Sequence, residues 1–177
     1  MRRLALSAPL TSDETGDMPR TAHVPSDRTA GPAEASTAHR ALVDDPVVWL
    51  SSVQRDGRPH VVPVWFHWDG ERIVAFSKPN ARKVDNLRDQ PSVMLAVGTP
   101  GPDFEVELIE ATAELPATPA AEWMPDGFGP KYRDLLRRAG LSLQRFTEVY
   151  SQPIVLHPIR FLGYGGHGWQ GGAAAAT

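Results

Sequence analysis

The segment RPHVVPVWFHW, residues 58–68, constrains the fold more than any other stretch, because both of its faces are apolar. Alternate residues of a β-strand point to opposite sides of a sheet. One face carries Val62, Val64, Phe66 and Trp68, and the other carries Val61, Pro63 and Trp65. An antiparallel sheet normally leaves one face to water. The pattern therefore predicts the wall of a barrel whose outer side is covered by a helix, a second subunit or a flat ligand.

Turn and gap signals surround and interrupt this predicted strand. The pairs Asp56-Gly57 and Asp69-Gly70 bound it, and such pairs are typical of tight hairpin turns. Pro63, near its middle, has no N–H to donate to a neighbouring strand. We therefore expect a bulge or gap there, which leaves strand backbone available to a ligand.

Six segments have the composition of strands, and short helices separate some of them. The strands are predicted at 47–54, 58–68, 72–77, 92–98, 104–115 and 153–163. A short helix follows the third strand, and a helical pattern fills residues 118–150. The apolar phase of the fifth strand changes between Leu108 and Ile109, as expected where a strand bends. The sequence predicts a mainly β (α+β) fold, an antiparallel six-stranded split β-barrel with a few helices.

The barrel is expected to occupy residues 40–164. Residues 1–39 are rich in Thr, Ser, Pro, Asp and Gly without apolar periodicity and predict a disordered leader. Residues 165–177 predict a flexible Gly/Ala tail. No apolar run reaches the length of a membrane span or of a signal-peptide core, so we expect a cytoplasmic protein with no membrane partner.

Composition excludes several classes of function. The formal net charge is −3 and no long run of Lys or Arg occurs, which argues against general nucleic-acid binding. The chain has no cysteine, so thiolate nucleophiles and cysteine-based metal sites are excluded. Redox chemistry would therefore require a bound cofactor.

The segment FSKPNARKVDNL gathers the cations Lys78, Arg82 and Lys83 around the predicted first turn of a short helix, with Asn80 as its N-cap. Cations oppose the helix dipole at that end, each at a cost of up to about 0.3–1 kcal/mol. A bound anion would reverse the effect, because free N–H groups, the dipole and two cationic side chains would all face it. The segment therefore predicts a phosphate site.

A structural alternative stays open for the same cations. Arg82 would then pair with Asp85 or Asn86 on a solvated helix face. Lys83 would lay its aliphatic stem on the protein surface and keep its ammonium group in water. The helix would then carry no ligand.

Other candidate motifs are weaker. Residues 163–168 satisfy G-x-G-x-x-G, but neither a helix of sufficient length nor an acidic residue about 20 positions on follows them. His60 and His67 are seven residues apart on one predicted strand and so fall on opposite faces, which argues against a metal pair. No serine lies in a nucleophile-elbow context. No catalytic residue is identified, and no metal is expected. Trp65, next to the expected gap at Pro63, is the one aromatic residue for which we expect contact with a flat ligand.

Residues 49–97 resemble the pyridoxamine 5'-phosphate oxidase-like split-barrel family, and within it the branch that uses the deazaflavin coenzyme F-420 in place of FMN. The segments DGRPHVVPVWFHWDG and SKPNARKVDNL carry the resemblance. It implies a homodimer with a cofactor at each subunit edge. It also implies the cofactor-binding residues. The phosphate contacts would be Ser77, Lys78, Arg82 and Lys83. The backbone beside the tricyclic ring would be that of Val62, Pro63, Val64 and Trp65.

The resemblance implies an oxidoreductase that passes a hydride from reduced coenzyme F-420 to an unsaturated or conjugated small molecule. An FMN-dependent oxidase or reductase is the first alternative, and a cofactor-binding protein without turnover is the second. Arg55, Arg58 and Arg72 lie near the hairpin turns, where they could track the acidic tail of F-420. The chain lacks the C-terminal Arg- and Trp-containing motif of pyridoxamine phosphate oxidases, so oxidation of vitamin B6 is not expected.

Overall fold

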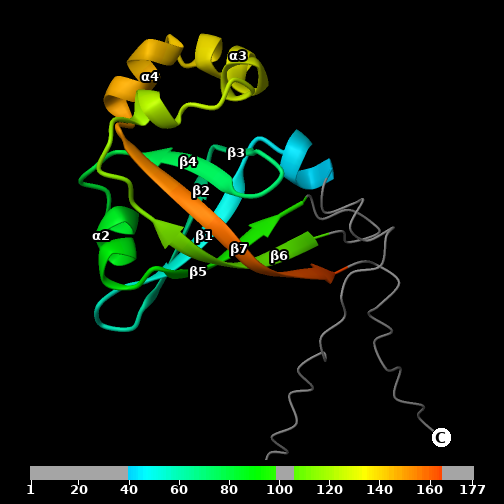
Figure 1. The fold of residues 1–177 in the computed structure, drawn as a ribbon, viewed down its shortest axis with the longest axis vertical. Helices are drawn as coiled ribbons and strands as arrows, with labels where there is room; N and C mark the ends of the chain where they lie inside the picture. The colour runs from blue at the N-terminus through cyan, green and yellow to red at the C-terminus, as the bar shows by residue number, and fades with distance from the viewer. Residues whose placement is uncertain (1–39, 99–105, 165–177) are drawn as a thin grey trace, which may run out of the picture.

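A computed structural model describes residues 40–98 and 106–164, which form one curled antiparallel sheet with short helices at its ends and on one side (Figure 1). The strands are β1 (Val48–Val53), β2 (Pro59–Val64), β3 (Phe66–Trp68), β4 (Ile73–Ser77), β5 (Ser92–Val97), β6 (Val106–Glu114) and β7 (Gln152–Tyr164). The helices are a short one at 40–44, α2 (Arg82–Asp89), the 3-10 helix η1 (Ala120–Trp123), α3 (Phe128–Arg138) and α4 (Leu143–Val149). The leader and tail predicted at 1–39 and 165–177 lie outside the described residues.

The sheet has seven strands rather than the predicted six, because the second predicted strand breaks at Trp65. The strand order is β2-β1-β5-β6-β7-β4-β3, with antiparallel pairing throughout. β2 pairs with β1 up to Val64, whereas β3 pairs with β4 from Phe66 onward. The two edge strands are thus consecutive in the chain, and a single residue between them closes the barrel.

The predicted gap at Pro63 is wrong by two residues. Pro63 keeps its place in the β1–β2 register, opposite Trp49. β2 is an edge strand, where the missing N–H of proline disrupts no second ladder. The ladder ends instead at Trp65, where the chain changes its partner from β1 to β4.

Helix α3 supplies the polar partners that the broken strand needs. The Tyr132 hydroxyl accepts from the N–H of Phe66 at 2.8 Å and lies 2.8 Å from the carbonyl of Phe66 and 2.9 Å from that of Pro46. Burial raises the pKa of this hydroxyl. The neighbouring Lys131 ammonium lies over the Phe66 ring, 3.8 Å from its centroid, and donates to the carbonyl of Leu42. Burial lowers the pKa of Lys131 to about 8.

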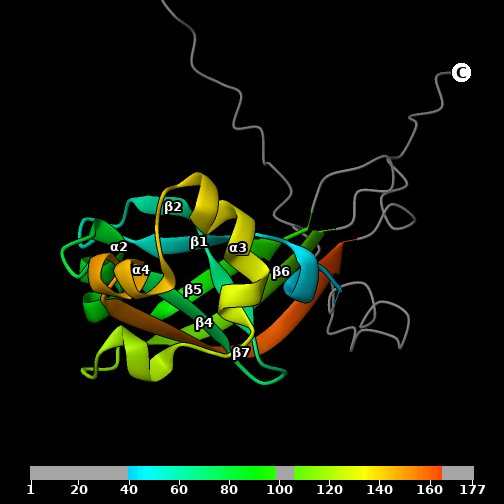
Figure 2. The same ribbon diagram turned by 90° about the horizontal axis from the view of Figure 1, so that it is seen from above.

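Two apolar clusters lie on opposite sides of β4. Ile73 and Ala75 belong to the cluster that fills the barrel. Val74 and Phe76 belong to a second cluster formed with η1, α3 and α4. These helices therefore cover the outer face of β4, as Figure 2 shows from above. A helical cover was one of the possibilities that the sequence predicted, and η1, α3 and α4 supply it here. Trp65 packs against the same helices.

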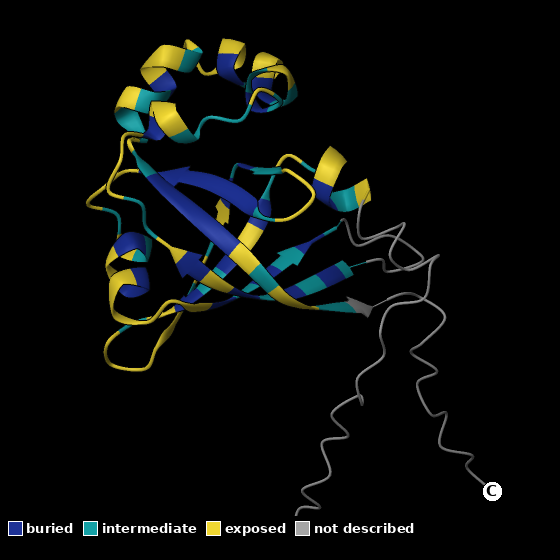
Figure 3. Cartoon of the chain, viewed as in Figure 1, coloured by how far each residue is buried: buried dark blue, intermediate teal, exposed yellow. Residues whose placement is uncertain are grey.

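The outer face of β1 and β2 has no such cover within the described chain. Trp49 is 48% exposed and Val61 is 54% exposed, although both side chains are apolar. Figure 3 colours exposed residues yellow along the described chain. Part of the doubly apolar segment thus remains uncovered.

The irregularity predicted between Leu108 and Ile109 also lies elsewhere. Buried residues alternate regularly in β6 from Glu107 through Ala113. The register shift falls between Glu110 and Ala111, opposite Arg160 and Pro158 of β7. The extra residue is Ile159, which is 70% exposed. β6 keeps its alternation because β7 carries the bulge.

Within residues 40–98 and 106–164, none of the helices has the length and apolar character needed to cross a membrane.

Candidate functional site

Helix α2 begins one residue later than predicted. Its N-cap is Ala81, in extended backbone geometry, and no side chain caps it, so Arg82 is its first residue. Asn80, the predicted N-cap, is exposed in a turn that the N–H of Ala81 closes by donating to the Lys78 carbonyl at 3.1 Å. The first N–H groups of a helix have no partner within that helix. The uncapped start of α2 therefore offers donors to an external acceptor.

Ser77 and Lys83 meet at this end of α2. Ser77 is the last residue of β4 and is buried. Its Oγ accepts from the Lys83 ammonium at 3.2 Å and donates to the Lys78 carbonyl, also at 3.2 Å. Burial lowers the pKa of Lys83 below its ordinary value. The lysine is thus held by a neutral hydroxyl at the junction of strand and helix.

Arg82 is also held by a neutral group. Its Nη1 donates to Oε1 of Gln54 at 2.8 Å, from the end of the β1–β2 hairpin. The alternative Arg82–Asp85 pair does not form, because Asp85 pairs with Arg88 at 2.7 Å. Other arginines of the described chain do pair with carboxylates, namely Arg55, Arg58, Arg72, Arg88, Arg137, Arg145 and Arg160.

The cations at the start of α2 are therefore compensated only in part. Arg58 mainly, and Arg82 from a longer distance, lower the pKa of the Asp56 carboxylate. Among the described residues, no carboxylate lies within ion-pair distance of Lys78, Arg82 or Lys83. The positive end of the α2 dipole adds to their field. We call Lys78, Arg82 and Lys83 the cation cluster. Its chemistry fits a phosphate group.

A cleft of about 440 Å³ adjoins the cation cluster. One wall consists of residues 78–81, and the other of Glu148, Val149 and Ser151 at the end of α4. The Glu148 carboxylate is 2.8 Å from Nη1 of Arg145. The cleft thus leaves room beside the cations, and the acid on its far wall is already paired.

The broken strand lies close to the same end of β4. Phe66 pairs with Ala75, so the next step in this register would place Trp65 opposite Phe76, one residue before Ser77. Trp65 belongs to neither strand, because the β1–β2 pairs end at Val64 and the β3–β4 pairs begin at Phe66. The break therefore lies next to the cation cluster.

The Trp65 side chain is not a free stacking platform. Its indole is stacked on Tyr132, with centroids 4.7 Å apart, and on Phe146, with centroids 5.6 Å apart. Val64 is buried in the barrel, Val62 packs against the same cluster, and Pro63 is exposed on the outer face. Any contact that these four residues make with a flat ring would therefore come mainly from backbone.

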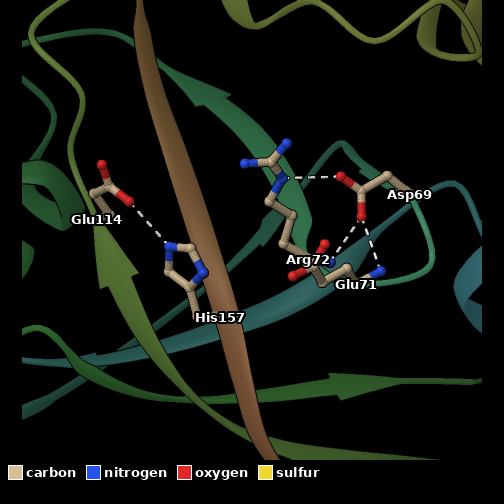
Figure 4. Close-up of polar contacts among 5 residues, drawn as sticks. All are labelled: Asp69, Glu71, Arg72, Glu114 and His157. Carbon is tan, nitrogen blue, oxygen red and sulfur yellow. Dashed lines mark hydrogen bonds and ion pairs between the residues drawn. The ribbon is translucent and has the colours of Figure 1, made fainter.

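The three arginines expected to track an acidic tail are engaged elsewhere. Arg55 pairs with Asp89, Arg58 with Asp56 and Arg72 with Asp69. Figure 4 shows the last of these pairs, beside the separate contact between Glu114 and His157. Arg72 also lies over the Trp123 ring at the far end of β4, on the wall of a smaller hollow of about 290 Å³. These pairings remove the support that the three arginines gave to F-420.

The histidines that the structure describes do not gather into a metal site. No group of three or more His, Asp or Glu residues that could hold a metal ion occurs in the parts of the chain that the structure describes. His67 instead packs so closely on Gly127 that a Cβ there would lie 2.4 Å from its Cε1. Burial lowers the pKa of His67.

Sequence reasoning missed two residues of this region. Gln54 reaches Arg82 across 28 positions, and Tyr132 reaches Phe66 across 66. Neither residue lies in a local motif. The two contacts form because α2 and α3 pack on the sheet.

This geometry is that of a split barrel with a cluster of cations where a strand meets a helix. A family model for pyridoxamine 5'-phosphate oxidase matches residues 35–144, and the chain belongs to that family. A search of curated proteins found no match.

Solved structures are similar over most of the chain. An F420 reductase is 25% identical, covers 70% of this chain and 94% of its own, and gives a TM-score of 0.50. An FAD-binding protein from Mesorhizobium loti is 19% identical, with 77% and 95% covered and a TM-score of 0.56. A conserved hypothetical protein from Mycobacterium tuberculosis is 20% identical, with 80% and 88% covered and a TM-score of 0.58. The last two show the fold alone.

Proposed function

We propose that this protein is an oxidoreductase that transfers a hydride from reduced coenzyme F-420 to an unsaturated or conjugated small molecule. The cation cluster carries the proposal, because three cations without carboxylate partners surround an uncapped helix start. The deazaflavin would supply the hydride chemistry. The protein would bind the phosphate through Ser77, Lys78, Arg82 and Lys83, and would orient the ring along the backbone of residues 62–65.

Support for F-420 over FMN comes from the sequence resemblance and from the similar F420 reductase. The cleft beside Lys78 adds space for a group that extends beyond the phosphate. FMN remains the second candidate, because its phosphate suits the cation cluster equally well. The cleft is the feature that would separate the two cofactors.

We expect fluorescence titration of the purified protein to give tighter binding of coenzyme F-420 than of FMN. Clearly tighter FMN binding would reverse the ranking in favour of an FMN-dependent oxidase or reductase. If F-420 is the cofactor, the protein should catalyse the reoxidation of reduced F-420 by conjugated enones. Tight binding without reoxidation across a panel of such acceptors would support a cofactor-binding protein without turnover.

We also propose a homodimer formed through the outer face of β1 and β2. Trp49 and Val61 are apolar, and each is about half exposed. Pro63 lies opposite Trp49 on the same face. A second copy of the chain is the commonest partner for an exposed apolar patch of this kind.

We expect the full chain to sediment as a dimer at micromolar concentration. The double substitution Trp49→Glu and Val61→Glu should give a monomer, because each carboxylate would lose its hydration in the interface. Val43→Glu is the matched control, since Val43 is also 48% exposed but lies in the helix at 40–44. A monomeric wild type, or a doubly substituted chain that remains dimeric, would contradict the proposed interface.

A further inference from the structure

The β1–β2 hairpin contacts α2 at three points along its length. Oε1 of Gln54 accepts from Arg82 at the start of the helix. Ser52 Oγ accepts from Nδ2 of Asn86 at 3.0 Å in its middle, and both of these residues are buried. Arg55 pairs with Asp89 at its end. Three contacts from residues 52–55 fix the helix against the hairpin.

Gln54 itself is held firmly by its backbone. Its N–H donates to the carbonyl of Arg58, and its carbonyl accepts from the N–H of Gly57, each at 2.9 Å. These two bonds close the hairpin turn. The Gln54 side chain therefore starts from a defined position next to the first turn of α2.

The chemistry of Gln54 differs from that of the other arginine partners. Arg82 meets a neutral amide, whereas Arg55 and Arg58, close by on the same hairpin, meet carboxylates. A carboxylate at position 54 would cancel the charge of Arg82, but an amide orients the guanidinium and leaves its charge in place. In the described chain, Nε2 of Gln54 has no protein partner, so its two N–H donors are also available beside Arg82.

We propose that Gln54 is a further residue of the anion site. It orients Arg82 through Oε1 and donates to a phosphate oxygen through Nε2. The ligand class is a phosphate monoester or diester, as in FMN or coenzyme F-420. This inference rests on the proposed function, because it requires the phosphate to bind at the cation cluster.

The test compares cofactors with and without the phosphate. Dissociation constants are measured for coenzyme F-420 and its phosphate-free deazaflavin alcohol, and for FMN and riboflavin. Gln54→Ala should weaken binding of the phosphate-bearing member several-fold. Gln54→Glu should weaken it by roughly tenfold or more, since it adds a charge that repels the anion and pairs with Arg82. Neither change should alter binding of the phosphate-free member.

Gln90→Glu is the matched control, because Gln90 is exposed at the other end of α2. It adds the same charge beside the opposite end of α2 and should leave every affinity unchanged. Thermal midpoints of the variants check folding, and Gln54→Glu should be no less stable than wild type, because it gains an ion pair with Arg82.

The outcomes separate this inference from the proposed function. If Gln54→Glu binds the phosphate-bearing cofactors as wild type does while Arg82→Ala weakens them, the role of Gln54 is overturned and the anion site stands. If Arg82→Ala also has no effect, the proposed site fails and the Gln54 inference fails with it. Equal losses for the phosphate-bearing and phosphate-free members would also overturn it, since they indicate a general structural effect.

Discussion

Replacing both Arg82 and Lys83 by alanine should weaken cofactor binding by more than about tenfold, because two charge-assisted contacts to the phosphate are lost. The empty protein should be as stable as wild type or slightly more so. Both cations oppose the α2 dipole, and Lys83 is half-buried, where the Ser77 hydroxyl is its one hydrogen-bond partner among the described residues. Fluorescence titration and the thermal midpoint of the double variant measure the two quantities.

Arg137→Ala provides the control for this experiment. Arg137 lies in the last turn of α3 and pairs with Asp134, so its loss frees no carboxylate of α2. Its loss should leave cofactor affinity unchanged and should cost little stability, because an exposed pair of this kind contributes only about 0.2–0.5 kcal/mol. If the double variant bound cofactor as tightly as the Arg137 control, α2 would not be the phosphate site.

Tyr132→Phe should lower the free energy of unfolding by about 2–3 kcal/mol. The substitution preserves the aromatic ring and its stacking on Trp65, but it removes the hydroxyl that meets the N–H and carbonyl of Phe66 and the carbonyl of Pro46. Buried backbone groups without partners are costly, because they lose water and gain nothing in return. Urea unfolding measures the difference.

Tyr150→Phe is the matched control for the hydroxyl deletion. Tyr150 belongs to the same aromatic cluster, where it stacks on Phe146, but within the described residues no protein group bonds its hydroxyl. Its replacement should change stability by less than about 0.5 kcal/mol. If the two variants unfold at the same urea concentration, Tyr132 is not the polar support of the strand break.

The sequence predicted the local parts of this structure well. Asp56-Gly57 and Asp69-Gly70 mark the two turns, and Gly57 and Gly70 have positive φ values of 83° and 101°. The approach of Ser77 to Lys83 also follows from a short separation, because a strand end and the next helix start lie close together. The family assignment is confirmed by the match over residues 35–144.

Features that depend on long-range packing were predicted less well. Periodicity gives the faces of residues 58–68, but it cannot show that the chain changes partner at Trp65, since both partners lie elsewhere in the sequence. The Trp65 ring was expected to meet a ligand, yet residues 67 and 81 positions later in the chain, Tyr132 and Phe146, cover it. The roles of the predicted cofactor-binding residues stay predictions.

The break between β2 and β3 at Trp65 affects which substitutions the proposed cofactor site can tolerate during evolution. A ligand that lies against the main chain at Trp65 would contact backbone N–H and C=O groups. Every residue except proline supplies both groups. Substitutions that preserve the buried Val64 and the stacked Trp65 can therefore accumulate in this segment without removing the contact. Selectivity between cofactors would then depend on side chains around the site, namely Gln54, Lys78 and the cleft wall at Glu148. These side chains lie outside the strands, so they can be exchanged without disturbing the sheet.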